Sequence, residues 1–359
     1  MKICFLADAS SIHAKRWITF FRDQGYECII LTFNKPADNI PGVRLYILKH
    51  PFRISYEHSN WQYLLQLPTI WGLIRRFKPD IVNAHFLSSY GFLAALACPK
   101  KVPLVISLYG SDILIIPKRS LLHRFVAIYS LKHAQLITSV AQHMTIALQQ
   151  YISNQKPVLT MQYGINTQVF CPPLVIVDRA PIALSTRSMV KVSQLETLLQ
   201  AALILKETQS PLRFDIAGNG ELRSKLENLT VNLGLRKMVH FVGVIPPEQM
   251  PDTLHRMAIY ISTSVSDGAS LSLLEAMACG ALPVVTDIPA NREWITHGDN
   301  GLLTQPGSPE DLAEKLTQAW GDESLRQKAA KRNWEIIRER GDYQTNMSKI
   351  EQEFNKLIS

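Results

Sequence analysis

Short runs rich in Ile, Val and Leu recur along the chain and alternate with longer amphipathic segments, and this rhythm restarts near the middle of the sequence. Continuous apolar strands alternating with helices are typical of a parallel sheet that helices cover on both faces. The pattern therefore predicts an α/β protein with two doubly wound domains. The expected strands are 2–7, 28–32, 80–84, 104–107, 136–139 and 158–161 in the first half, and 181–186, 213–217, 239–242, 259–263, 282–286 and 301–303 in the second.

The chain has 359 residues, of which 47% are hydrophobic, so it is long enough and apolar enough to build two cores. We place the first domain at 1–172 and the second at 173–335. The remaining residues, 336–359, are charged and helical in pattern, and they either end the second domain or return over the first. Ligands of doubly wound sheets bind beyond the carboxyl ends of the strands, so the cleft between the two domains is the expected active site.

The formal net charge of +8 is unevenly distributed. Residues 1–173 carry 18 Lys/Arg against 7 Asp/Glu, a net charge of +11, whereas the remainder carries 20 against 23, a net charge of −3. An anionic partner is therefore expected for the first half only, and a membrane surface, a phosphorylated acceptor and a nucleic acid all fit. Ordinary solubilising charges fit as well. The sequence lacks zinc-finger spacing, an RNP-like strand and a concentrated basic run, which argues against nucleic acid.

The five cysteines are widely scattered, without a pair at the spacing of a metal or redox site. We therefore expect no bound metal and a reducing, cytoplasmic environment. The first apolar run ends at Asp8, too short for a signal peptide, and no segment approaches the ~18 apolar residues that span a bilayer. Any membrane association is expected to be peripheral, at the inner face, through basic amphipathic helices at 15–21, 61–78 and 118–132. Burial of these apolar residues in the core is the alternative.

The stretch 264–287 carries the clearest sign of chemistry. Ser266 and Asp267 favour a helix start, and 271–279 is a run of good helix formers that follows at once. A helix N-terminus beyond a strand end binds phosphate oxygens. Glu275 is the one charged residue in this apolar helix, and its carboxylate either accepts the hydroxyl groups of a ribose or is simply solvated.

The segment SDGASLSLLEAMACG, in which seven residues separate Asp267 from Glu275, resembles the acidic-x7-acidic signature of glycosyltransferase family 4. The resemblance covers nearly the whole second domain and is looser in the first, and it implies a GT-B fold and retaining transfer from a nucleotide-sugar, without cofactor or metal. Further pieces lie in family order: LSTRS at 184–188, AGNGELR at 217–223, FVGVIPPEQMPDTLHRMAIYISTS at 241–264, TDIPANREWI at 286–295, NGLLTQPGSPEDLAEKL at 300–316, and, in the first domain, PDIVNAHFLSSYG at 79–91 and LYGSDI at 108–113.

The resemblance assigns roles to individual residues. Glu275 resembles the ligand of the donor ribose, and Arg187 resembles the arginine that pairs with the leaving diphosphate. A guanidinium also suits that task on chemical grounds, because cleavage of the sugar–phosphate bond builds negative charge on the leaving group. An ordinary loop arginine is the alternative. The implied donor-binding residues are Gly218, Gly220, Val244, Gly268, Ser270, Leu271, Ser272 and Glu275, and the implied catalytic residues are Arg187, Lys191, Asp267 and His85.

Two positions depart from the family pattern. Asp267 stands where family members usually carry Glu, so its carboxylate reaches less far toward the transferred sugar. The family also places a lysine five or six residues after the arginine, as a second phosphate clamp, but those positions are Val192 and Ser193 here. Lys191 falls one residue early and substitutes only if the loop is re-routed. Otherwise Arg187 holds the diphosphate with backbone help alone.

Polar residues after the strands of the first domain are candidate acceptor ligands. His85 follows the strand at 80–84, where a family histidine approaches and positions the reacting sugar; a satisfied polar residue is the alternative. The loop after the first strand carries polar side chains instead of the glycine pair that many family members use. Asp112 is either a hydroxyl ligand or a helix cap. The predicted acceptor-binding residues are Ser11, His13, Arg16, Gly110 and Asp112.

The sequence thus predicts a retaining glycosyltransferase that moves a sugar from a UDP-sugar or GDP-mannose to a glycan or lipid-linked acceptor, in cell-surface polysaccharide synthesis by analogy. A nucleotide-sugar-binding protein with weak or lost activity is the main alternative, because of the displaced lysine and of Asp267. A Rossmann oxidoreductase is disfavoured by the missing G-x-G-x-x-G turn after the first strand. A basic nucleic-acid binder predicts steeply salt-dependent binding to DNA or RNA.

Overall fold

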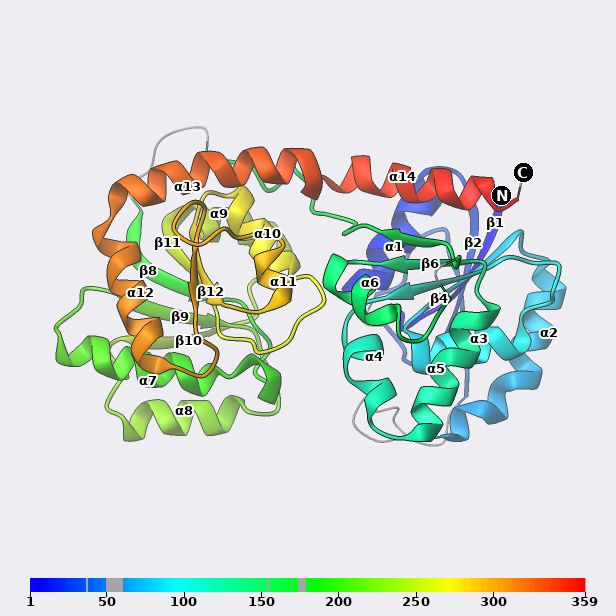
Figure 1. The fold of residues 1–359 in the computed structure, drawn as a ribbon, viewed down its shortest axis with the longest axis horizontal. Coiled ribbons are helices and arrows are strands. Elements are labelled where there is room, and N and C mark those ends of the chain that lie inside the picture. The colour runs from blue at the N-terminus through cyan, green and yellow to red at the C-terminus, as the bar shows by residue number, and fades with distance from the viewer. Residues whose placement is uncertain (37, 50–60, 154, 174–178, 359) are drawn as a thin grey trace. The chain divides into compact units, whose positions relative to one another are not determined.

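The computed structural model describes residues 1–36, 38–49, 61–153, 155–173 and 179–358. The chain forms two compact units (Figure 1). The first contains Met1–Gln162 together with Thr345–Ser359, and the second contains Tyr163–Gln344. The division therefore falls at Gln162, ahead of the expected boundary at residue 172, and the last helix counts with the first unit. No helix among the described residues is long and apolar enough to cross a membrane.

The first unit is built on a parallel sheet of seven strands in the order β3-β2-β1-β4-β5-β6-β7. The central strands are buried along their whole length, as the continuous apolar runs predicted. The strands are β1 (Lys2–Leu6), β2 (Glu27–Thr32), β3 (Arg44–Ile47), β4 (Ile81–His85), β5 (Leu104–Leu108), β6 (Leu136–Ser139) and β7 (Val158–Thr160).

Strand β3 was not predicted from the sequence. It is an edge strand of four residues, RLYI, whose ends are exposed and whose middle is only half-buried. A short edge strand needs no continuous apolar run, so the signal that revealed its neighbours is weak here. His85 was expected just after its strand, but the parallel register runs on to His85 and Ser107, which makes His85 the last residue of β4.

The helices of the first unit lie on both faces of this sheet, and Figure 1 shows α2, α3 and α5 grouped away from α1 and α14. On the α1 side, Phe21 stacks on Phe354 of the C-terminal helix at 5.1 Å between ring centroids, so α14 covers the aromatic residues of α1. The helices are α1 (Ile12–Asp23), α2 (Leu67–Phe77), α3 (Phe92–Ala97), α4 (Ser111–Leu114), α5 (Leu121–His133), α6 (Gln142–Leu148) and α14 (Tyr343–Lys356).

The second unit contains a parallel sheet of six strands in the order β10-β9-β8-β11-β12-β13. The chain order of these strands reverses beside β8, which puts a topological switch point between β8 and β11. The strands are β8 (Ala180–Ser185), β9 (Arg213–Ala217), β10 (Val239–Gly243), β11 (Met257–Ser262), β12 (Leu282–Thr286) and β13 (Leu302–Thr304).

Two apolar cores sandwich this second sheet. Alternate residues of β8 point to opposite faces, so Ala183 packs in the core with α7 and α12, whereas Leu184 packs in the core with α10. The predicted fold of two doubly wound parallel sheets is thereby confirmed. The helices are α7 (Leu195–Glu207), α8 (Arg223–Asn232), α9 (Met250–Arg256), α10 (Leu271–Ala278), α11 (Pro289–Arg292), α12 (Pro309–Gly321) and α13 (Glu323–Ile336).

Candidate functional site

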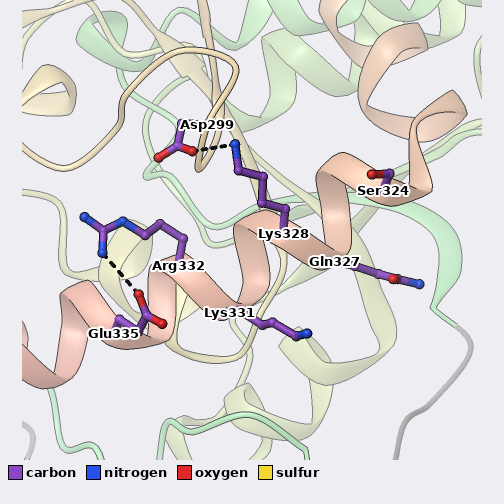
Figure 2. Close-up of a pocket in the computed structure, with 7 residues that line it drawn as sticks. All are labelled: Asp299, Ser324, Gln327, Lys328, Lys331, Arg332 and Glu335. Atoms are coloured by element: carbon purple, nitrogen blue, oxygen red, sulfur yellow. Dashed lines mark hydrogen bonds and ion pairs between the residues drawn. The ribbon is translucent and has the colours of Figure 1, made fainter.

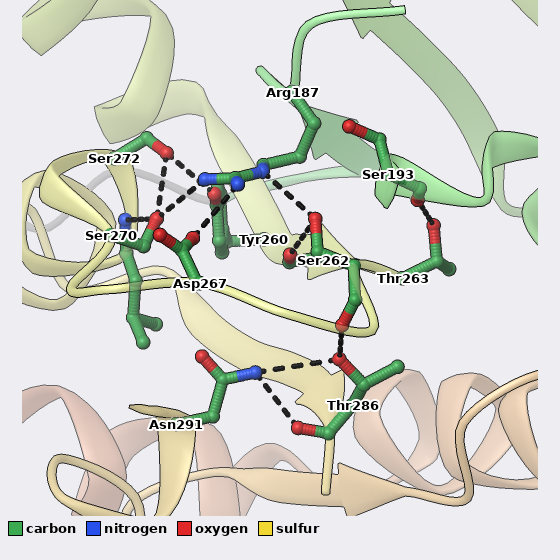
Figure 3. Close-up of polar contacts among 12 residues, drawn as sticks. Arg187, Ser193, Tyr260, Ser262, Thr263, Asp267, Ser270, Ser272, Thr286 and Asn291 are labelled. Atoms are coloured by element: carbon green, nitrogen blue, oxygen red, sulfur yellow. Dashed lines mark hydrogen bonds and ion pairs between the residues drawn. The ribbon is translucent and has the colours of Figure 1, made fainter. Parts of the chain in front are cut away.

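Arg187 lies in the loop directly after β8, where three elements bring polar groups around its guanidinium (Figure 3). Its Nη2 forms an ion pair with Oδ2 of Asp267 at 2.8 Å. Its Nε donates to the hydroxyl of Ser264 at 3.1 Å, and its Nη1 donates to the hydroxyl of Ser270 at 3.0 Å. Two residues that the sequence assigned to catalysis, Arg187 and Asp267, are therefore in direct contact.

The charge of Arg187 is held in place by its surroundings. Burial opposes the charged guanidinium, but the Asp267 carboxylate and Tyr260 outweigh burial and raise the pKa of Arg187 above its ordinary value. Both members of the ion pair keep 18% of their side-chain surface exposed. Arg187 is therefore a fixed cation that remains reachable at the carboxyl edge of the sheet.

The N-terminus of α10 meets this cation. Ser270 caps the helix by accepting the backbone N–H of Leu273 at 3.3 Å while it also accepts from Arg187. Its hydroxyl lies 3.1 Å from that of Ser272, which in turn lies 2.8 Å from the Tyr260 hydroxyl. A guanidinium and the first amides of a helix thus converge on one place, an arrangement that suits phosphate oxygens.

Glu275 lies on the incompletely buried side of α10. Leu271, Ser272 and Glu275 are half-buried, whereas the helix residues between them, such as Leu274, are buried. Positions three and four apart share a face of a helix, so the Glu275 carboxylate is on the same side as the first turn of α10. Gly268, just ahead of the helix, is buried.

The loop after β11 is anchored to its neighbours on both sides. Thr286, at the end of β12, donates its hydroxyl to the Ser264 carbonyl, and Asn291 donates to the Thr286 carbonyl at 2.8 Å. On the other side, Thr263 donates to the Ser193 carbonyl at 2.6 Å. These bonds fix the strand end that carries Ser264, which in turn fixes Arg187.

Lys191 begins the short 3-10 turn Lys191–Ser193 and is exposed. This turn lies beside the Asp267 loop, because the backbone N–H of Val265 donates to the carbonyl of Val192 at 3.0 Å. Lys191 is therefore on a loop that contacts the segment leading to Asp267. Among the described residues, the Lys191 side chain forms no hydrogen bond or ion pair with the Asp267 carboxylate.

The glycines of the 217–223 loop allow it to press against the Arg187 loop. A Cβ on Gly220 would lie 2.4 Å from the carbonyl oxygen of Met189, far inside contact distance. Met189 also exchanges backbone hydrogen bonds with Asn219 and Leu222 at 3.0 Å each. Gly218 has φ of +112°, a conformation that glycine adopts readily.

The loop that carries Arg187 and the 217–223 loop are therefore held together by backbone contacts next to Arg187. Val244, the remaining predicted donor ligand, follows β10 and is 72% exposed. It lines a separate hollow with Asp215 and Gln249.

In the first unit, His85 is buried with both ring nitrogens engaged. Its Nε2 lies 2.9 Å from Oδ1 of Asn83, and its Nδ1 lies 2.8 Å from the hydroxyl of Tyr109. The Asn83 oxygen can only accept, so Nε2 carries the proton and Nδ1 accepts from Tyr109. Burial, followed by the nearby charge of His13, lowers the pKa of His85 to about 3. A neutral imidazole that orients Tyr109 fits these contacts.

Asp112 is fully buried, and backbone amides hold its carboxylate. Oδ1 accepts from Tyr109 at 3.2 Å and from Gly110 at 2.9 Å, and Oδ2 accepts from Leu87 at 3.2 Å. Burial raises the pKa of Asp112, while these amides act in the opposite direction. The carboxylate therefore ties the loop after β5 to the loop after β4.

The remaining predicted acceptor residues lie at the start of α1. Ser11 is the residue before the helix, His13 places its ring 5.3 Å from that of Tyr109, and Arg16 follows one turn later. All three are half-buried. The structure thus brings His13, Tyr109 and His85 together, whereas the buried Asp112 carboxylate holds the backbone of the loop that carries Tyr109.

A depression on the surface of α13 contains none of the predicted site residues (Figure 2). Two of the cations that line it are paired with carboxylates, Lys328 with Asp299 at 2.7 Å and Arg332 with Glu335 at 3.1 Å.

All five cysteines are free thiols; Cys4, Cys28 and Cys279 are buried, whereas Cys98 and Cys171 are partly buried. Burial raises the pKa of Cys28 and of Cys98 to about 12, which keeps these thiols protonated and unreactive. Within the part of the chain that the structure describes, no cluster of three or more His, Cys, Asp or Glu side chains could hold a metal ion.

Sequence reasoning missed Ser264, Tyr260 and Asn83. No local sequence pattern singles out Ser264 as a site residue, because its contact with Arg187 depends on the pairing of strands that are distant in the sequence. A signal did exist for the other two. Tyr260 and Asn83 are polar groups within the apolar runs of β11 and β4, and buried polar groups in strands need partners.

Comparison with known proteins covers both units. A model of the glycosyl transferases group 1 matches residues 172–335, and a model of glycosyl transferase 4-like proteins matches residues 2–141. The chain is 23% identical to N-acetyl-alpha-D-glucosaminyl L-malate synthase of Bacillus anthracis, over 88% of this chain and 86% of that protein. An exopolysaccharide phosphotransferase of Streptomyces coelicolor is 36% identical over 39% of this chain and 15% of that protein.

Solved structures share the fold. Sucrose-phosphate synthase from Thermosynechococcus elongatus superposes with a TM-score of 0.85 at 16% identity and covers 99% of both chains. Anabaena HepE in complex with UDP and glucose has a TM-score of 0.80 at 18% identity, over 99% of this chain and 100% of that one. The predicted GT-B fold is thus confirmed.

Fold and family models together define an enzyme that transfers sugars, as the sequence predicted. The chain belongs to the group 1 glycosyltransferases of the family 4 type.

Proposed function

We propose that this enzyme transfers a sugar from a UDP-sugar, with retention of anomeric configuration, to a hydroxyl group of a glycan or lipid-linked acceptor in polysaccharide synthesis. The observation that carries the proposal is the meeting of Arg187 with the capped N-terminus of α10 at 3.0 Å. This pair offers a delocalised cation and backbone amides to a diphosphate at one point.

Donor binding requires Arg187 to change partners. In the free protein its guanidinium is neutralised by Asp267 at 2.8 Å. The carboxylate oxygens there stand in for phosphate oxygens, since both are anionic acceptors that match the guanidinium fork. A bound diphosphate takes over this contact, and Asp267 is released toward the sugar end of the donor. Glu275, on the same side of α10, then accepts the ribose hydroxyl groups.

The chemistry follows from where charge develops. As the bond from the sugar to the diphosphate breaks, negative charge grows on the leaving phosphate, and Arg187 together with the α10 amides stabilises it. His85 is unsuited to be a general base, because a lowered pKa and two engaged nitrogens leave it no basic lone pair to offer. The leaving phosphate itself then takes the acceptor proton on the same face, which retains configuration.

Names of similar proteins support the donor and the pathway. Crystal structures of Anabaena HepE hold UDP or UDP-glucose, which favours a UDP-sugar over GDP-mannose. The exopolysaccharide phosphotransferase relative favours an acceptor in polysaccharide synthesis. The alternative, a donor-binding protein with weak or no transfer activity, is favoured by the Asp267 side chain and by the exposed Lys191, which forms no described bond with the Arg187 group.

A donor screen distinguishes the two proposals. The enzyme is incubated with UDP-glucose, UDP-N-acetylglucosamine and GDP-mannose, nucleotide release is measured, and the anomeric configuration of the freed or transferred sugar is read by proton NMR. We expect release of UDP and a product with the anomeric configuration of the donor. An inverted product would contradict the retaining mechanism. UDP binding without release from any donor would favour the inactive alternative.

A further inference from the structure

The exposed face of α5 is apolar, which is unusual for a helix that covers a sheet. Leu121 is 86% exposed and Phe125 is 59% exposed, and Leu122 and Ile128 are exposed as well. At about 100° per residue, Leu121, Phe125 and Ile128 fall within an arc of roughly 60° on the outside of the helix. We call these four residues the α5 apolar row. The helix is about 20 Å long, and the row occupies roughly its first half, about 10 Å from Leu121 to Ile128.

Cations surround the α5 apolar row. Lys118 and Arg119 are exposed just before the helix, Arg124 is exposed on one flank, and Lys132 lies on the outer face one turn beyond Ile128. Acidic residues are rare in the sequence around α5. Between Asp80 and Asp178 the one acidic residue is Asp112, which is buried, whereas seven Lys/Arg lie in the same stretch.

The adjacent helices extend this surface. Helix α3 packs against both α2 and α5, and Figure 1 shows the three on one side of the first unit. Leu96 of α3 and Trp71 of α2 are exposed, and the Arg75 guanidinium stacks over the Trp71 ring at 3.7 Å. Exposed aromatic rings beside cations are typical of side chains at a membrane interface.

The other basic, aromatic helix of this unit has a different fate. Trp17, Phe20 and Phe21 of α1 are buried, and Phe354 of α14 covers part of them. The α1 aromatics therefore belong to the core. Among the three basic amphipathic segments of the sequence, the α5 segment is the one whose apolar residues are most exposed.

We propose that the α5 face docks on the surface of an anionic lipid bilayer, with the α5 apolar row inserted among the headgroups and the flanking cations against lipid phosphates. Charge decides between this partner and a second copy of the chain. In a two-fold symmetric dimer the same surface meets itself, so the cations around the row would face one another. An anionic, apolar-cored surface complements both parts of the face. Docking in the plane of the interface requires no spanning helix.

Vesicle flotation tests this surface directly. The purified full-length enzyme is mixed with vesicles of equal phosphatidylglycerol and phosphatidylcholine, or of phosphatidylcholine alone, at low and high salt. We expect binding to the anionic vesicles that weakens at high salt. Phe125→Glu should lower the vesicle partition coefficient at least about tenfold, since it removes an inserted ring and adds a repelled charge. Replacing Arg124 and Lys132 with Gln should lower it roughly tenfold or more.

Ile146→Glu is the matched control. Ile146 of α6 is 58% exposed against 59% for Phe125, and both lie in the first unit, so the change in surface and charge is equivalent. Circular dichroism of each variant verifies folding. Equal binding to both vesicle types, or equal loss in the Phe125 and Ile146 variants, would overturn the proposal. So would a wild-type dimer in light scattering that Phe125→Glu dissociates while vesicle binding stays unchanged. Neither donor nor acceptor is present, so failure here leaves the proposed transfer reaction untouched.

Discussion

Replacement of Arg187 by Ala separates the contribution of this side chain to catalysis from its contribution to donor binding. In the free enzyme the guanidinium is already satisfied by Asp267 at 2.8 Å, by Ser264 at 3.1 Å and by Ser270 at 3.0 Å. A diphosphate gains only the difference between these contacts and its own. We therefore expect Arg187→Ala to raise the Kd of UDP by less than about tenfold.

The effect on turnover should be larger. Negative charge on the leaving phosphate grows between the bound state and the transition state, so the loss of a fixed cation is felt mainly in kcat. Removing one preorganised donor to developing charge typically costs about 3–4 kcal/mol, which predicts a fall of about 10²–10³ in kcat. Arg187→Lys keeps the charge but not the fork that binds Asp267 and Ser270 together, so it should fall between the two.

Steady-state kinetics of UDP release, with titration calorimetry for UDP affinity, measures both quantities. The control is Arg332→Ala on α13, which removes an exposed guanidinium that is also paired with a carboxylate, Glu335, at 3.1 Å. It should leave both parameters unchanged. The reasoning would be refuted if Arg187→Ala weakened UDP binding and kcat by the same factor, or if kcat did not change.

Three further predictions concern Asp267, Gly220 and His85. Asp267→Asn removes the carboxylate that competes for Arg187, so UDP should bind about three- to tenfold more tightly by calorimetry; weaker binding would contradict the exchange of partners. Gly220→Ala forces a Cβ against the Met189 carbonyl at 2.4 Å, so the free energy of unfolding of the second unit, measured in urea, should fall by about 2 kcal/mol or more. An unchanged free energy of unfolding would contradict this close approach.

His85 should make the first unit sensitive to acid. Its pKa is lowered from 6.5 to about 3 in the folded chain, so the unfolded state binds the extra proton first, and the stability that neutral His85 contributes is present above pH 6.5 and is lost as the pH falls toward 3. Relative to His85→Gln, wild type should lose about 1.4 kcal/mol of unfolding free energy per pH unit in that window. The same change in unfolding free energy for wild type and His85→Gln between pH 7 and pH 5, measured from urea curves, would contradict this.

The strands of both sheets could be predicted because most are buried on both faces. β6, β9 and β12 occupy the residues that their apolar runs indicated. β3 could not be predicted, because an edge strand is half-exposed and needs no such run. The start of α10 was predicted only in part: the helix begins at Leu271, as its run of helix formers indicated, but its cap is Ser270, whereas Ser266 and Asp267 were expected to start the helix.

Contacts between distant segments were not readable from the sequence. That Asp267 pairs with Arg187 depends on β8 and β11 being neighbours in the sheet, which no local pattern encodes. The same holds for the apolar helices of the first unit. The sequences of α1 and α5 both mix bases with aromatic residues, but the α1 aromatics pack against the sheet and against α14, whereas the α5 apolar row is exposed. For His85 the sequence left two roles open, a residue that positions the sugar and a satisfied polar residue, and the hydrogen bonds to Asn83 and Tyr109 could be found only in the structure.

Calorimetric titration with UDP tests the central claim most directly, using wild type, Glu275→Ala and the matched control Glu335→Ala. Glu275 lies on α10 beside the proposed diphosphate site, whereas Glu335 is an exposed glutamate on α13. We predict that UDP binds wild type and Glu335→Ala equally, and that Glu275→Ala loses roughly tenfold or more in affinity, as expected for a charged hydrogen-bond partner of the ribose. Equal affinity in all three proteins, or no UDP binding to wild type, would contradict the placement of the donor at the N-terminus of α10.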